Sequence, residues 1–169
     1  RTEGGTALLN AATVYKAAGR AEESMSLFSR AEELYRRLLP PDDERMGGLY
    51  NNMALTLVDL GRFSEARTCY SEAIRVMSLQ KNGKPETAIT WLNLASLSES
   101  EFGLESDEAQ EEISACLRNA SDLLEQEKDR TDGGYAFVCE KCAPVFGRYG
   151  YFWMEEELNE RARRIYQRA

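Results

Sequence analysis

The feature that most constrains this chain is an internal repeat with a period of 42 residues. Gly19, Gly61 and Gly103 recur at that interval, and Gly150 follows 47 residues after the third of them. Self-similarity of this length is typical of repeat proteins, in which each unit buries its apolar surface only against its neighbours. The 169 residues therefore predict about four stacked units.

Within each unit the apolar residues have helical spacing. In the second unit a first stripe, at positions i, i+3, i+4 and i+7, comprises Tyr50, Met53, Ala54 and Leu57. Gly61 is expected to end that helix, because glycine readily adopts the conformation of a C-terminal cap. A second stripe, at positions i, i+4 and i+7, comprises Ala66, Tyr70 and Ala73. Each unit therefore predicts a hairpin of two helices, which stacks on its neighbours to form a solenoid.

The order of residue types in this unit resembles the tetratricopeptide repeat, whose usual length is 34 residues. The longer period and the segment Leu49–Ala54 are more similar to the repeats of kinesin light chains and their bacterial relatives. The resemblance is strong in the first two units, fair in the third and weak in the fourth. In the fourth unit we expect Pro144 and Gly147 to interrupt the first helix.

The resemblance implies an all-α fold, a right-handed superhelical solenoid of about four stacked hairpins. We expect a single domain over residues 1–169. Its repeats are expected at about residues 5–38, 47–80, 88–127 and 135–168. The implied function is that of a protein-interaction scaffold, which binds a protein or an extended peptide in a concave groove and catalyses no reaction. The alternative is self-association, or a sensor or scaffold segment of a larger regulatory protein.

Composition narrows the remaining classes of function. Histidine is absent, which excludes Ser-His-Asp and Cys-His catalysis and the common zinc motifs, so we expect no metal and no cofactor. The net charge of −8 disfavours nucleic acid and anionic membranes as partners. No apolar run is long enough to span a bilayer. The four cysteines are too few and too irregular for a disulfide framework and indicate free thiols in the cytoplasm.

Asn10, Asn52 and Asn93 occupy one position in three units, about 200° around the helix from the start of the apolar stripe. A carboxamide carries a donor and an acceptor, so these side chains can bond both polar groups of a peptide backbone. Alternatively, they are polar residues tolerated on a wet face, or they bond neighbouring helices. The full set of candidate peptide-binding residues is Asn10, Thr13, Asn51, Asn52, Asn93, Ser96, Lys141 and Arg148. Because Asp59 and Glu99 share this strip with Lys16, we expect a groove of mixed charge.

Three further features have two interpretations each. The Cys139-x-x-Cys142 pair indicates core packing, with a redox pair as the alternative. The aromatic cluster from Phe146 to Trp153 predicts either a sealed end of the solenoid or an interface. The acidic run from Glu99 to Glu112 favours a solvated turn and the start of a helix over a cation site.

Overall fold

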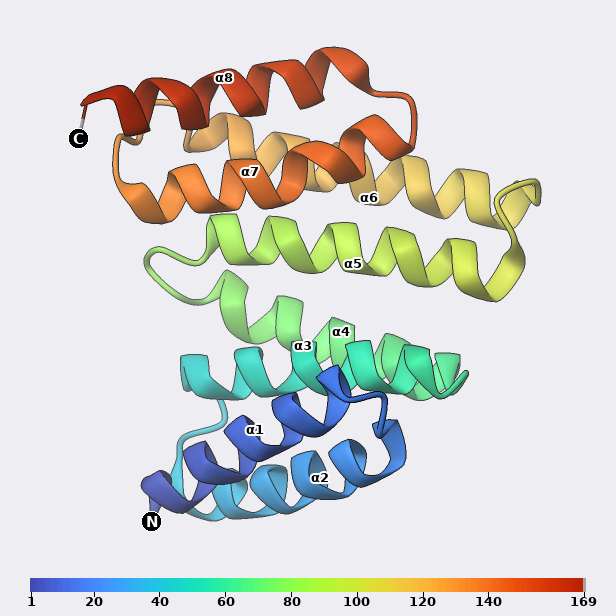
Figure 1. Cartoon of the computed structure of the whole chain (residues 1–169), viewed down its shortest axis with the longest axis vertical. Coiled ribbons are helices and arrows are strands. Elements are labelled where there is room, and N and C mark those ends of the chain that lie inside the picture. Colours follow the sequence, from blue (N-terminus) through green and yellow to red (C-terminus); the bar gives the residue numbers. More distant parts are fainter. Residues whose placement is uncertain (169) are drawn as a thin grey trace.

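The computed structural model describes residues 1–168, which form eight helices and no strand (Figure 1). The helices pack in consecutive hairpins, α1 with α2, α3 with α4, α5 with α6 and α7 with α8. Their bounds are α1 Thr2–Ala17, α2 Ala21–Leu38, α3 Glu44–Asp59, α4 Phe63–Ser78, α5 Lys84–Phe102, α6 Asp107–Gln126, α7 Gly133–Arg148 and α8 Phe152–Arg168. The predicted all-α solenoid of stacked hairpins is confirmed.

The four periodic glycines make the turn inside each hairpin. Gly19, Gly61, Gly103 and Gly150 have φ values of 77°, 73°, 81° and 87°, a region in which a side chain is strained. In the second hairpin the N–H of Arg62 donates to the carbonyl of Leu57 (2.9 Å), which closes the helix end across the glycine. The repeat period in the sequence is therefore the period of these helix ends.

The hairpins stack so that their first helices touch one another. Helix α1 contacts α3, α3 contacts α5, and α5 contacts α7, whereas α2 and α4 pack on the first helix of the following hairpin (Figure 1). We call the side formed by α1, α3, α5 and α7 the first-helix surface. The buried side chains form two clusters, one in α1–α4 together with Leu97 and one in α5–α8, which meet where α4 packs on α5.

Small residues allow the two helices of a hairpin to approach closely. A Cβ atom added at Gly5 would lie 2.2 Å from the ring of Tyr35, and one added at Gly47 would lie 2.6 Å from the sulfur of Met77. Both pairs stand 42 residues apart, so the close approach is itself part of the repeat.

The expected interruption of the fourth unit is wrong. Helix α7 is continuous from Gly133 to Arg148, with Pro144 inside it and exposed. A proline in a helix costs about 3 kcal/mol. This cost is offset because Cys139, Cys142 and Phe146 are buried, and a buried apolar side chain contributes roughly 1.5–3 kcal/mol.

The acidic run does start a helix, as predicted. The first turn of α6 contains Asp107 and Glu108, and the hydroxyl of Ser106 accepts the N–H of Ala109 (3.2 Å) as its cap. Among the described helices, none is long and apolar enough to cross a membrane.

Candidate binding surface

A pocket of about 420 Å³ opens on the first-helix surface, over the N-terminal halves of α3 and α5. We call it the first-helix pocket. The residues that line it are Glu44, Arg45, Gly48, Asn51, Asn52, Met77, Glu86, Thr90 and Lys141. Three candidates from the sequence, Asn51, Asn52 and Lys141, therefore come together here from two different helices.

The asparagines of the strip have different environments. Asn93 donates its side-chain N–H to the side-chain oxygen of Asn51 (3.1 Å), and the hydroxyl of Thr90 donates to the same oxygen (3.3 Å). These two asparagines thus bond neighbouring helices, α3 and α5, which was one of the alternatives. The carboxamide of Asn52 bonds no other group within residues 1–168 and is partly exposed at the pocket wall. Among the pocket's asparagines, Asn52 is the one whose carboxamide takes part in no hydrogen bond among residues 1–168.

The other candidates lie outside the pocket. Asn10 and Thr13 are exposed on α1, and the Thr13 hydroxyl donates to the carbonyl of Leu9 (2.9 Å) in its own helix. Ser96 likewise donates to a carbonyl of α5, that of Leu92 (3.4 Å). Arg148 bonds the carboxylate of Glu99. The structure therefore does not bring these four residues to the pocket.

Two ion pairs link neighbouring helices on the first-helix surface. Lys16 of α1 lies 3.4 Å from Asp59 of α3, and Arg148 of α7 pairs with Glu99 of α5. The mixed charge expected from the sequence thus resolves into ion pairs that link one hairpin to the next. Exposed ion pairs of this kind contribute about 0–1 kcal/mol each to stability. The side chains that form them are not free to pair with a ligand.

Of the two cations that line the pocket, one has no ion pair among the described residues. Arg45 donates twice to Asp43, from Nε (2.9 Å) and Nη2 (2.8 Å), and this guanidinium lowers the pKa of the Asp43 carboxyl. Lys141 forms no ion pair within residues 1–168, and its Nζ lies 5.9 Å from the centre of the Phe137 ring. Because Glu44 and Glu86 also line the pocket, its walls offer charges of both signs.

Sequence reasoning missed several wall residues, of which Gly48 is the most informative. A Cβ atom at Gly48 would meet nothing within 4 Å, so the glycine leaves free space at the pocket wall. The Gly47–Gly48 pair was visible in the sequence, but its two members have opposite roles. Gly47 is buried against Met77, whereas Gly48 faces the pocket.

The cysteines offer no reactive thiolate. All four are free thiols, and Cys139 and Cys142 are 0% and 1% exposed on α7. Burial raises the pKa of both thiols, that of Cys142 to about 12, so they are protonated at neutral pH. This environment supports the packing interpretation over a redox pair. Among the described residues, no group of three or more acidic or cysteine side chains is placed to hold a metal ion.

A solenoid of hairpins with an open pocket on its first-helix side defines a helical-repeat protein, a class that uses extended surfaces to bind other proteins. The comparisons with known proteins agree. The sequence model of the tetratricopeptide repeat matches residues 5–77. This confirms the resemblance found in the sequence over residues 5–77. Repeats of this family typically serve as non-enzymatic scaffolds.

One solved structure supports the fold over nearly the whole chain. BtubC (BKLC) from P. vanneervenii is similar with a TM-score of 0.64 and 18% identity, over 96% of this chain and 63% of that chain. The chain thus spans less than two thirds of the length of that protein. A putative kinesin light chain of Podosopora anserina with nearly identical TPR-like repeats has a TM-score of 0.44 and 16% identity, over 96% of this chain and 95% of its own. No curated protein matches the sequence.

Proposed function

We propose that this chain is a protein-interaction scaffold that holds an extended segment of a partner in a concave groove on its first-helix surface. The observation that carries the proposal is the free carboxamide of Asn52 beside the open wall at Gly48. A carboxamide matches the N–H and C=O groups of one peptide unit, since it donates and accepts together. The missing side chain at Gly48 lets the backbone of a bound segment come close to α3.

Besides this contact with the peptide backbone, the charges of the pocket favour charged side chains on the bound segment. Lys141 is expected to pair with a carboxylate of the bound segment, because no carboxylate of residues 1–168 already pairs with it. The partner is a protein or peptide, and we expect neither nucleic acid nor a membrane, in keeping with the net charge of −8. We further propose that all four repeats act as one unit, without a cofactor or a catalysed reaction, in the cytoplasm.

A library of random peptides tests the proposal directly. Random dodecapeptides displayed on phage would be selected against the whole chain, and the strongest binder synthesised for isothermal titration calorimetry. Asn52→Ala removes two hydrogen bonds of about 0.5–1.5 kcal/mol each, so affinity should fall by about tenfold. Asn119→Ala is the matched control, because Asn119 is an exposed asparagine on α6.

The proposal fails if Asn52→Ala and Asn119→Ala bind the selected peptide equally well. It also fails if the selection returns no peptide that binds the folded chain. Lys141→Ala should weaken peptides that carry an acidic residue and leave neutral peptides unaffected.

Self-association is the second candidate function, and one observation favours it. Phe152 and Trp153 of the last hairpin are 68% and 64% exposed, which is unusual for adjacent large aromatic side chains. Light scattering decides between the two functions. The scaffold proposal expects a monomer, and a stable dimer that dissociates on Trp153→Ser would replace it.

A further inference from the structure

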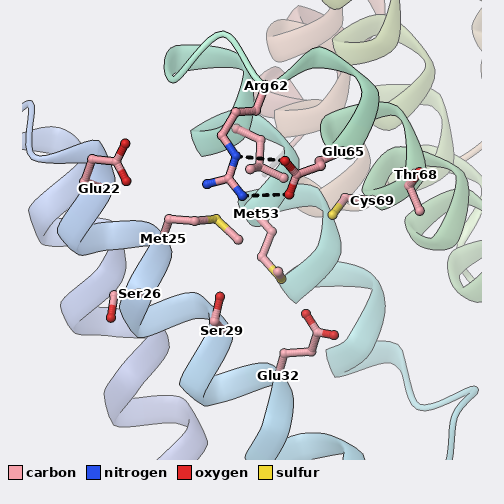
Figure 2. Close-up of a pocket in the computed structure, with 11 residues that line it drawn as sticks. Glu22, Met25, Ser26, Ser29, Glu32, Met53, Arg62, Glu65, Thr68 and Cys69 are labelled. Carbon is pink, nitrogen blue, oxygen red and sulfur yellow. Dashed lines mark hydrogen bonds and ion pairs between the residues drawn. The ribbon is translucent and has the colours of Figure 1, made fainter.

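A second hollow, of about 560 Å³, lies on the opposite side of α3, between the second helices α2 and α4. We call it the second-helix groove. Helix α2 packs on α1 and α3, and α4 packs on α3 and α5, so the space between α2 and α4 is open above α3. Figure 2 shows the sulfur atoms of Met25, Met53 and Cys69 in this space, with hydroxyl and carboxylate groups around it.

Comparison with the next repeat shows what this groove lacks. When the repeats are aligned, Met25 is equivalent to Arg67, which follows it by 42 residues. Cys69 stands 43 residues before Glu112, a register fixed by the buried residues Tyr70 of α4 and Ile113 of α6. Met25 and Cys69, which face each other across the groove, are thus the counterparts of Arg67 and Glu112.

In the next gap, between α4 and α6, these counterparts close the space. The guanidinium of Arg67 donates to Glu112 (2.6 Å) and to Glu101 (2.8 Å) and lies 5.3 Å from the centre of the Phe102 ring. The first gap has two sulfur side chains where the second has an ion pair. The gap between α2 and α4 therefore lacks the ion pair that bridges the gap between α4 and α6.

The floor of the groove is apolar and uncharged. Met25, Met53 and Leu57 are buried, with exposed fractions of 9%, 4% and 1%. Burial raises the pKa of the half-buried Cys69 thiol to about 11, so this side chain is neutral at physiological pH. Methionine sulfur makes favourable contacts with aromatic rings. The volume of the groove lies within the range of roughly 300–1,000 Å³ that is typical of ligand-binding pockets.

The rim of the groove is acidic. It carries the carboxylates of Glu22, Glu32 and Glu65 but one guanidinium, that of Arg62. Arg62 donates to Glu65 from Nε (2.9 Å) and Nη2 (2.7 Å) and is thereby neutralised (Figure 2). Glu32 pairs with Arg36 (2.8 Å), so Glu22 is the rim carboxylate that has no ion pair among residues 1–168, and it complements a cation placed beside the group that fills the floor.

We propose that the second-helix groove is a second docking site, and that its occupant is a partner segment with one aromatic side chain flanked by lysine or arginine. The ring fills the sulfur-lined floor, and a flanking cation lies against the Glu22 carboxylate of the rim. This site is separate from the first-helix pocket and does not depend on it. A scaffold with both sites holds two different segments at once.

The repeat itself supplies the variant that tests this site. The double substitution Met25→Arg/Cys69→Glu installs the residue types of the Arg67–Glu112 pair, fills the groove and leaves the net charge unchanged. The probe is a fluorescein-labelled pentapeptide with tryptophan between two pairs of lysine and arginine. Two further probes replace the tryptophan by serine or all four cations by glutamate. Binding is measured by fluorescence anisotropy, and circular dichroism verifies that the variant is folded.

We expect the basic tryptophan peptide to bind at least tenfold more tightly than either altered probe. The double variant should lose at least tenfold in affinity, whereas Asn52→Ala should leave this affinity unchanged. The proposal is overturned if all three probes bind alike, if none binds, or if the folded double variant still binds. If the groove instead holds a second copy, light scattering will show a dimer that the double variant abolishes, and this too overturns the proposal. Should the double variant fail to fold, Met25→Lys takes its place with the same probes and the same expected loss of affinity.

Discussion

Replacing Arg161 by methionine is expected to lower the free energy of unfolding by about 1–3 kcal/mol. Arg161 of α8 is 5% exposed and connects three helices. Its Nη1 atom donates to the carbonyl of Leu124 in α6 (3.3 Å) and to the hydroxyl of Tyr135 in α7 (3.0 Å). Its other nitrogens bond Glu157, at 3.0 Å, and Glu125.

The magnitude follows from what each partner keeps after the substitution. The hydroxyl of Tyr135 still donates to the carbonyl of Leu124 (3.1 Å), so that buried carbonyl is not left without a partner. The carboxylates of Glu125 and Glu157 are 46% and 42% exposed and regain water. The loss is therefore smaller than the roughly 3–5 kcal/mol of breaking a fully buried ion pair. Arg161→Ala also removes two methylene groups of the buried stem, Cγ and Cδ, at about 0.8 kcal/mol each, and should cost about 3–5 kcal/mol.

Urea unfolding followed by circular dichroism measures both losses, with linear extrapolation to water. Arg163→Met is the matched control, because Arg163 is 59% exposed and pairs with Glu160 on the surface, so its loss should stay below about 0.5 kcal/mol. The reasoning is refuted if Arg161→Met and Arg163→Met cost the same, or if Arg161→Met costs as much as Arg161→Ala.

Three other predictions follow from single positions. Arg130 beside Asp132 lowers the pKa of that carboxyl to about 2. The stabilisation from this pair is complete above the unfolded pKa of about 4 and is lost as the pH falls toward 2. The difference in Tm between the native chain and Asp132→Asn should therefore narrow as the pH falls from about 4 to about 2. Gly48→Ala should raise the free energy of unfolding by up to about 1 kcal/mol and weaken binding of the library-selected peptide. Gly5→Ala should lower the free energy of unfolding by about 1–2 kcal/mol, because its Cβ meets the Tyr35 ring. Urea unfolding measures both changes in free energy, which should have opposite signs. In the native protein a thiol reagent should modify Cys69 first, and rapid modification of the buried Cys116, Cys139 or Cys142 would contradict their packing role.

The fold was largely predictable because its determinants are local. Gly61 and its equivalents end each first helix through a backbone conformation that the residue type itself favours, and the helical spacing of buried residues repeats with them. Pro144 misled the prediction because the cost of proline is a local rule, whereas the burial of Cys142 and Phe146 that offsets it depends on the neighbouring hairpin.

The candidate site was predictable only in part. The position of Asn52 on the first-helix surface follows from the angle between residues in one helix. That Asn51 and Asn93 bond each other, and that Arg148 pairs with Glu99, depends on which residues of different hairpins face one another. The open groove at Met25 and Cys69 depends on how α2 and α4 of neighbouring hairpins are placed relative to each other, which the sequence of one repeat does not reveal.

The central claim is that the first-helix surface binds an extended segment, and hydrogen–deuterium exchange tests it most directly. The library-selected peptide would be added to the full chain, and amide exchange followed by mass spectrometry in the free and bound states. We expect slower exchange in α3 and α5 around Gly48, Asn52 and Thr90, with no change in α6 and α8. Slower exchange confined to α2 and α4, or to α6 and α8, would contradict the account.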